Sequence, residues 1–126
     1  MPGNDSHYPE DWRAIAEKDW KRAQSMADED PELAGFCLQR AVEKFLKAFL
    51  LSKGWRLRRI HNLEALLDEA IKYDEGLERF RSACQTITAF YFMERYPFTV
   101  QIGIDRDDVK KAVTQIKDLI EKIQKI

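Results

Sequence analysis

Apolar residues recur three or four positions apart along most of the chain, which is the spacing of amphipathic helices. The pattern breaks at clusters of glycine, proline and polar residues and therefore divides the chain into five helical segments. The second is apolar on more than one side, which is typical of the central helix of a bundle. The predicted segments are about Pro9 to Ala27, Pro31 to Lys53, Asn62 to Ile71, Gly76 to Tyr96, and Asp105 to Ile123.

Boundary residues support these limits. Asp30 can cap the free amides of the second helix, and Pro31 suits a first helical position. Gly54 is placed to end that helix, and Pro97 disfavours helical geometry in the residue before it. The stretch Pro97 to Ile104 (PFTVQIGI) is β-branched and is predicted to be a loop or an ordered arm.

The fold class predicted from this pattern is all-α, an up-and-down antiparallel bundle of four to five helices. A chain of 126 residues fits one domain, which we assign to residues 1–126 with a flexible N-terminus at 1–8. No repeat or low-complexity tract interrupts it.

Charged residues make up 34% of the chain but are nearly balanced, with 21 Lys plus Arg against 22 Asp plus Glu. The pI of about 6.1 excludes a generally basic surface for nucleic acid, although it permits a local basic patch. No apolar run is long enough to span a membrane, and the start of the chain does not resemble a signal peptide. We therefore expect a cytoplasmic protein with no membrane partner. Cys37 and Cys84 fall in apolar patterns and are expected to pack in the core, so we expect no metal and no cofactor.

Polar side chains stand at regular positions in the otherwise apolar second helix. Gln39, Glu43 and Lys47 follow a four-residue step and share one face. Glu43 precedes Lys47 in the order that favours an ion pair. The interpretation from spacing alone is a solvated helix face.

The same positions belong to a longer pattern, Q-x-x-x-E-K-x-x-K-A from Gln39, then H-N-L-x-x-L-L from His61, then R-Y-P from Arg95. With Trp12 and Asp19-Trp20 in the opening helix, this order resembles the HEPN domain family over essentially the whole chain. The resemblance implies a small helical bundle that forms a homodimer. It also implies a stand-alone prokaryotic protein of the kind paired with a minimal nucleotidyltransferase in toxin–antitoxin-like systems, and a nucleotide- or RNA-binding role.

Many members that the chain resembles are metal-independent ribonucleases with an Arg, four to six residues, and then a His. That motif is expected at or after Arg95, but no histidine follows His61 in the chain. Arg56 and His61 reproduce the spacing in a different place, the linker before the third helix. We therefore predict no catalytic residues, with Arg56 and His61 as the alternative pair. His61 also has a structural interpretation, in which its ring packs on or bonds to the opening turn of that helix.

Phosphate binding is the chemistry that the linker favours. Cationic side chains cluster beside a helix start, where backbone amides attract anions, and guanidinium groups can hold phosphate with two bonds. Arg95 is either a helix terminator or the remaining half of the lost catalytic pair. The predicted nucleotide- or phosphate-binding residues are Lys44, Lys47, Lys53, Arg56, Arg58, Arg59, His61 and Arg95, with Lys44 and Lys47 joining only if packing allows.

Three functions remain open at this point. The first is a HEPN-type binding protein for nucleotide or RNA, without nuclease activity. The second is a metal-independent ribonuclease. The third is a purely structural dimerising partner, in which the aromatic run AFYFMERYPF forms an interface.

Overall fold

The computed structural model describes residues 6–95 and 105–125, with the backbone alone for 91–95 and 125. Within these ranges the chain is helical and contains no strand, which confirms the all-α prediction. The elements are α1 (Pro9–Met26), α2 (Pro31–Ser52), α3 (Leu63–Ile71), the 3₁₀ helix η1 (Glu75–Phe80), α4 (Arg81–Arg95) and α5 (Arg106–Lys125).

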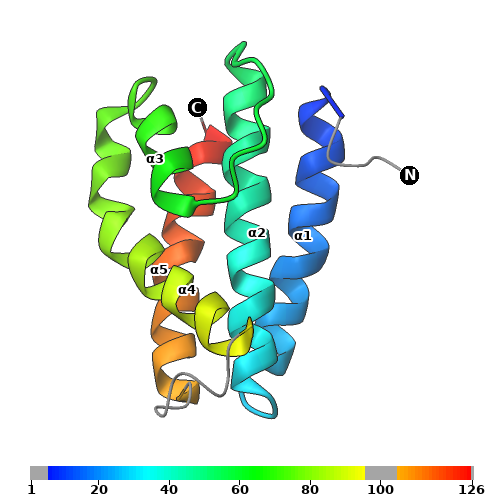
Figure 1. Ribbon diagram of the computed structural model, residues 1–126, viewed down its shortest axis with the longest axis vertical. Helices are drawn as coiled ribbons and strands as arrows, with labels where there is room; N and C mark the ends of the chain where they lie inside the picture. Colours follow the sequence, from blue (N-terminus) through cyan, green and yellow to red (C-terminus); the bar gives the residue numbers. More distant parts are fainter. Residues whose placement is uncertain (1–5, 96–104, 126) are drawn as a thin grey trace.

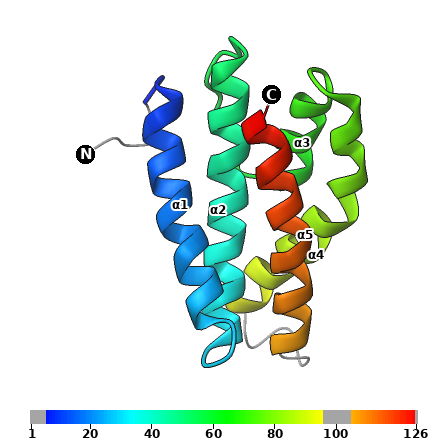
Figure 2. The same cartoon turned by 180° about the vertical axis from the view of Figure 1, so that it is seen from behind.

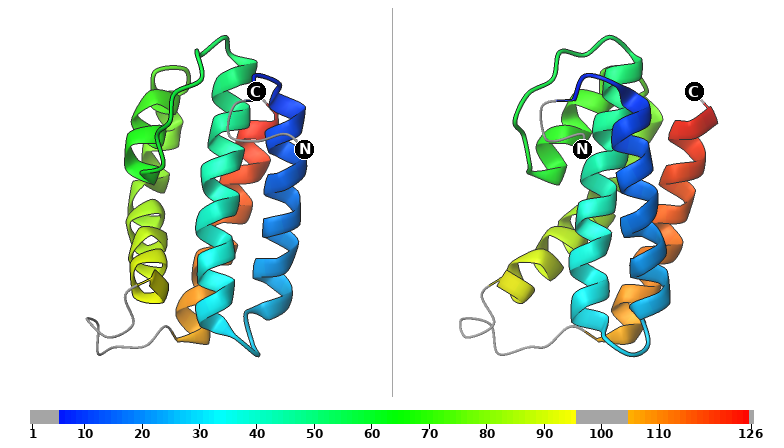
Figure 3. Two further views of the ribbon diagram at one scale, coloured as in Figure 1. Left: turned by 45° about the vertical axis from the view of Figure 1, so that its right-hand side comes forward. Right: turned by 90° about the vertical axis from the view of Figure 1, so that its right-hand side faces the viewer.

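Helix α2 lies in the middle of the bundle, as its apolar pattern predicted. Helix α1 runs antiparallel beside it, α5 crosses behind, and α3 with α4 covers the other side (Figures 1 and 2). Every residue from Ala41 to Leu50 is buried. The connector 53–62 runs back along α2 before α3 begins, so α3 points the same way as α2 (Figure 3).

The predicted helix ends are confirmed at three capping residues. The Asp30 carboxylate accepts a hydrogen bond from the Leu33 amide at 3.1 Å, and the Asn62 side chain accepts one from the Ala65 amide at 3.0 Å. Asp105 accepts one from the Asp107 amide at 2.7 Å. Each bond satisfies an amide that has no partner within its own helix.

The fourth helical segment differs from the prediction at its start. It opens as η1 at Glu75, and α-helix begins only at Arg81. The Asp74 side chain accepts a hydrogen bond from the Gly76 amide at 3.0 Å, and glycine has a low preference for regular helix. A tighter turn therefore precedes α4.

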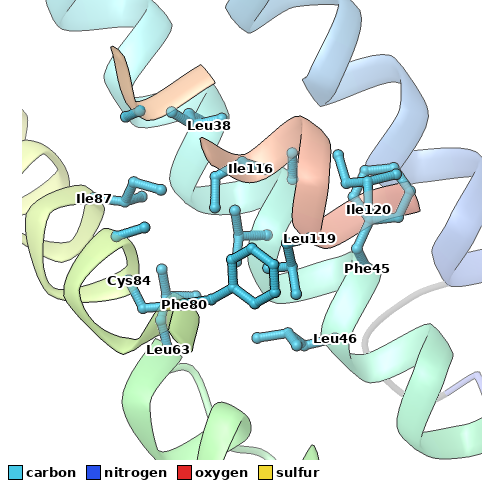
Figure 4. Close-up of a cluster of buried hydrophobic side chains, with 14 of the residues drawn as sticks. Leu38, Phe45, Leu46, Leu63, Phe80, Cys84, Ile87, Ile116, Leu119 and Ile120 are labelled. Atoms are coloured by element: carbon cyan, nitrogen blue, oxygen red, sulfur yellow. The ribbon is translucent and has the colours of Figure 1, made fainter. Parts of the chain in front are cut away.

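Apolar side chains from α2, α3, α4 and α5 meet in one cluster (Figure 4). Cys37 and Cys84 are free thiols buried in it, as predicted. Burial raises the pKa of Cys84 to about 12, so this thiol is inert at neutral pH. At Gly35, α4 comes so close that an added Cβ would lie 2.9 Å from the Cβ of Phe90.

The predicted loop at 97–104 and the last three residues of the aromatic run lie outside the described residues. Of the aromatic side chains in that run, only that of Phe90 is described, and it is buried. Of the N-terminal segment 1–8, Ser6 is bonded to α1 through its carbonyl, which accepts a hydrogen bond from the Trp12 indole at 2.8 Å. No helix in the described part of the chain is both long and apolar enough for a membrane span.

Candidate functional site

Three polar side chains of α2 form a buried network against α1. Gln39, Glu43 and Lys47 are only 6%, 8% and 2% exposed. The Lys47 ammonium lies 3.0 Å from Oε2 of Glu43, and the Gln39 amide lies 3.4 Å from Oε1. The solvated-face interpretation is therefore wrong, because α1 packs over this face of α2. The predicted ion pair is present and buried, so removal of one partner costs more stability than it would at an exposed position.

Trp12 of α1 covers the ammonium end of the network. The Lys47 nitrogen lies 5.1 Å from the centre of the indole ring, within range of a cation–π interaction. Trp12 itself is 2% exposed. The Lys47 charge is thus compensated by a carboxylate on one side and by an aromatic face on the other.

His61 joins the network from the connector. Its Nδ1 lies 3.0 Å from the same oxygen of Glu43 that pairs with Lys47. An ionised carboxylate only accepts hydrogen bonds, so Nδ1 is the donor. Nε2 has no hydrogen-bond partner among the residues that the structure describes. The predicted bond of His61 to the opening turn of α3 is replaced by this longer-range contact, and Asn62 alone caps the turn. The imidazole is 62% exposed, so Nε2 is accessible to solvent.

Glu43 is ionised because its partners outweigh its burial. Burial acts to raise the pKa of this carboxyl, but the hydrogen bond from His61 and the charge of Lys47 bring it below the usual value of 4.5. One buried carboxylate therefore fixes both a helix lysine and a connector histidine.

The connector that carries the predicted cations is fixed to the bundle at both of its ends. At its start Gly54 adopts a left-handed φ of +87°, and the Trp55 amide donates to the Leu50 carbonyl at 3.0 Å. Trp55 also packs against the core. At the other end, the Glu43–His61 bond and the Asn62 cap hold the chain as it enters α3.

The predicted cations differ in what they contact. The Lys53 ammonium lies 5.7 Å from the centre of the Phe49 ring. Arg58 donates to Glu69 at 2.7 Å, which partly neutralises it. Arg56 and Arg59 are exposed, and Arg56 has no ion-pair partner within the described part of the chain. The connector thus presents Arg56, Arg58, Arg59 and His61 at its surface.

The two lysines of α2 are placed apart from this set. Lys47 is sealed in the network, where its ammonium is already used by Glu43. Lys44 is 9% exposed, and burial, together with the charge of Arg40, lowers its pKa. Arg95 lies in the last turn of α4, and its side chain is outside the described residues.

Sequence reasoning did not assign Glu43 and Trp12 to the site, although both stand in the quoted patterns. The informative signal was the polar four-residue step inside a helix that is apolar on more than one face. Such a helix is buried, so polar residues within it must find partners.

No curated protein and no solved structure matches the chain. The model of the HEPN domain matches residues 9–126, from the first helix to the last residue. This match covers nearly the whole chain and confirms the resemblance drawn from the ordered motifs. The structure places the first motif on α2, with Gln39, Glu43 and Lys47 in the buried network, and the second at the start of α3 in the same bundle. The chain belongs to the HEPN domain family.

Proposed function

We propose that this HEPN protein binds the phosphate groups of a nucleotide or of RNA, without cutting RNA, and that the connector 53–62 is the contact surface. The observation that carries the proposal is the set of basic side chains that this short connector presents: Arg56, Arg58, Arg59 and His61. No histidine follows His61 in the chain, so the family's usual catalytic pair has no second member at its expected place.

A fixed connector supports binding because less conformational entropy is lost when the ligand arrives. Arg56 is exposed and has its guanidinium donors available for a phosphate. The start of α3 follows the other end of the connector, next to His61 in the chain, and contributes the positive end of a helix dipole. Arg58 contributes less, because Glu69 already pairs with it.

His61 supports the same proposal through its free nitrogen. Glu43 accepts from Nδ1 and so orients the ring, which leaves Nε2 at the exposed edge of the connector. When the imidazole is protonated, Nε2 is a charged donor for a phosphate oxygen. Glu43 is therefore a positioning residue for the site and does not itself contact the ligand.

The experiment is a calorimetric titration with ATP and with a short single-stranded RNA. Arg56→Ala is expected to weaken binding by about tenfold, the usual effect of losing a charge-assisted hydrogen bond. Lys117→Ala is the matched control, because it removes an exposed cation from α5. Affinity should also fall as salt increases. Equal affinities for the Arg56 and Lys117 variants, or no binding of either ligand, would contradict the proposal.

A second candidate function, metal-independent RNA cleavage, is favoured by the Glu43–His61 contact. A carboxylate that holds Nδ1 leaves Nε2 free to take a proton from a 2′-hydroxyl, and Arg56 supplies a cation for the charge that develops on the phosphate. Incubation of the protein with RNA and a chelator tests this function. Cleavage that His61→Ala abolishes would establish it in place of pure binding, whereas intact RNA would support the binding module.

The family resemblance supports two partners, a second copy of the chain and a minimal nucleotidyltransferase in a toxin–antitoxin-like pair. Light scattering at micromolar concentration tests the homodimer, and a monomer there would contradict it. Co-purification with a transferase encoded next to this gene tests the second partner. A structural, dimerising role alone would be indicated by a dimer that binds neither nucleotide nor RNA.

A further inference from the structure

A second candidate site lies between α1 and the first half of α2. It is a hollow of about 430 Å³, within the usual size range of small-ligand pockets. Its floor is apolar and consists of Met26, Leu33, Phe36 and Cys37. Leu33 is 37% exposed and lies beside the other apolar side chains of this floor, so part of the floor is open to solvent.

Charged side chains form one edge of this hollow. Asp19 is 2% exposed and lies 3.4 Å from Nη1 of Arg22 and 3.5 Å from Nε of Arg40. Both distances are long for ion pairs, and each guanidinium has five N–H donors. The two arginines are 65% and 45% exposed. A single carboxylate thus holds two guanidinium groups together while leaving most of their donors available.

The balance of charge at this edge is positive. Lys44 lies one helical turn after Arg40 and has no carboxylate within ion-pair distance in the described part of the chain. Arg40 also lies over the ring of Phe36, with 5.8 Å between the guanidinium carbon and the ring centre. The positive charge and the apolar floor are therefore adjacent, so a ligand with an anionic group and a short apolar body complements both.

We propose that this hollow binds a small organic carboxylate, with its apolar body on Leu33 and Phe36 and its carboxylate held by Arg22 and Arg40. A cationic ligand would be repelled by the two guanidinium groups, and a neutral ligand would leave most of their hydrogen-bond donors unused. A bare phosphate would leave the apolar floor in water. The site is separate from the connector, because the side chains that line the hollow come from α1 and α2 and none comes from residues 53–62.

Three probes that differ mainly in charge test the proposal: 4-phenylbutyrate, its neutral amide, and 4-phenylbutylamine. Binding is followed by ¹H–¹⁵N NMR shifts of the labelled protein. For ligands of this size we expect a dissociation constant on the order of millimolar for the acid. The amide should bind about tenfold more weakly and the amine should not bind. Shifts should concentrate at residues of α1 and α2 around the hollow.

Arg40→Gln removes one of the two guanidinium groups that would donate to the ligand's carboxylate and leaves the apolar floor intact. It should therefore reduce the affinity for the acid to that for the amide. Phe36→Ala should weaken both probes, because it removes part of the floor that they share. Lys117→Gln, a change of the same charge on exposed α5, should leave both affinities unchanged, and circular dichroism verifies that each variant is folded. Equal binding of acid and amide to the unaltered protein would overturn the proposal, as would shifts that appear only at the connector.

Discussion

Substitution of Glu43 by glutamine tests whether the buried network stabilises the bundle. The change keeps the size of the side chain and one hydrogen-bond acceptor but removes its charge. Lys47 would then hold its ammonium, 2% exposed, without a counter-charge. Removing one partner of a buried ion pair costs about 3–5 kcal/mol. Because the Trp12 ring and the new amide oxygen still contact the ammonium, we expect the lower end, about 3 kcal/mol.

Urea denaturation followed by circular dichroism measures this loss. The m-value should not change, because the same surface is exposed on unfolding. Glu121→Gln on exposed α5 is the matched control and should stay within about 0.5 kcal/mol of the unaltered protein. The double variant Glu43→Gln/Lys47→Met should lose less unfolding free energy than the sum of the losses of the two single variants, by about 1–3 kcal/mol. A loss below about 0.5 kcal/mol for Glu43→Gln would refute the reasoning.

The pH dependence of the same variant provides an independent measurement. The pKa of Glu43 in the folded state lies below 4.5, so the folded protein binds its proton less readily than the unfolded chain. The stability from this carboxylate is fully present above pH 4.5 and is lost as the pH falls through the lowered pKa. The difference in unfolding free energy between the unaltered protein and Glu43→Gln should therefore be constant near pH 7 and shrink in acid. A difference that grows on acidification would contradict this.

Four further changes are expected to have distinct effects on the free energy of unfolding, each measured by urea denaturation. Gly35→Ala should cost about 1–3 kcal/mol because the new methyl group would overlap Phe90, whereas Gly76→Ala should be tolerated because its nearest neighbour is the mobile end of a lysine. Gly54→Ala should cost about 1–2 kcal/mol, because its φ of +87° is unfavourable for alanine. Lys44→Met should stabilise the protein at pH 7, because burial and the charge of Arg40 lower the pKa of Lys44. That advantage should shrink as the pH rises through the lowered pKa towards 10.5, and a destabilised variant at pH 7 would contradict it.

The helices could be predicted closely because their signals are local. Asp30, Gly54 and Asn62 act on the backbone within a few residues, and the apolar periodicity of α2 already indicated its central position. The start of η1 was missed because a 3₁₀ turn and an α-helical turn have nearly the same sequence preferences.

The site was predicted less completely because its contacts join distant parts of the chain. Gln39, Glu43 and Lys47 were located on one face, but spacing does not reveal whether a face meets water or another helix. The Glu43–His61 bond spans 18 residues and depends on the path of the connector along α2. Tertiary packing therefore decided both the burial of the network and the orientation of the histidine.

The enclosure of α2 limits where any other molecule can attach. All residues from Ala41 to Leu50 are buried by the neighbouring helices and the connector, so this stretch has almost no surface left for recruitment. Contact with another chain must use the outer sides of α1, α3, α4 or α5, the connector, or the ends of α2. A cross-linking or surface-mutation survey can consequently omit the middle of the most characteristic helix, and any effect of a change there on assembly would be indirect, through the bundle itself.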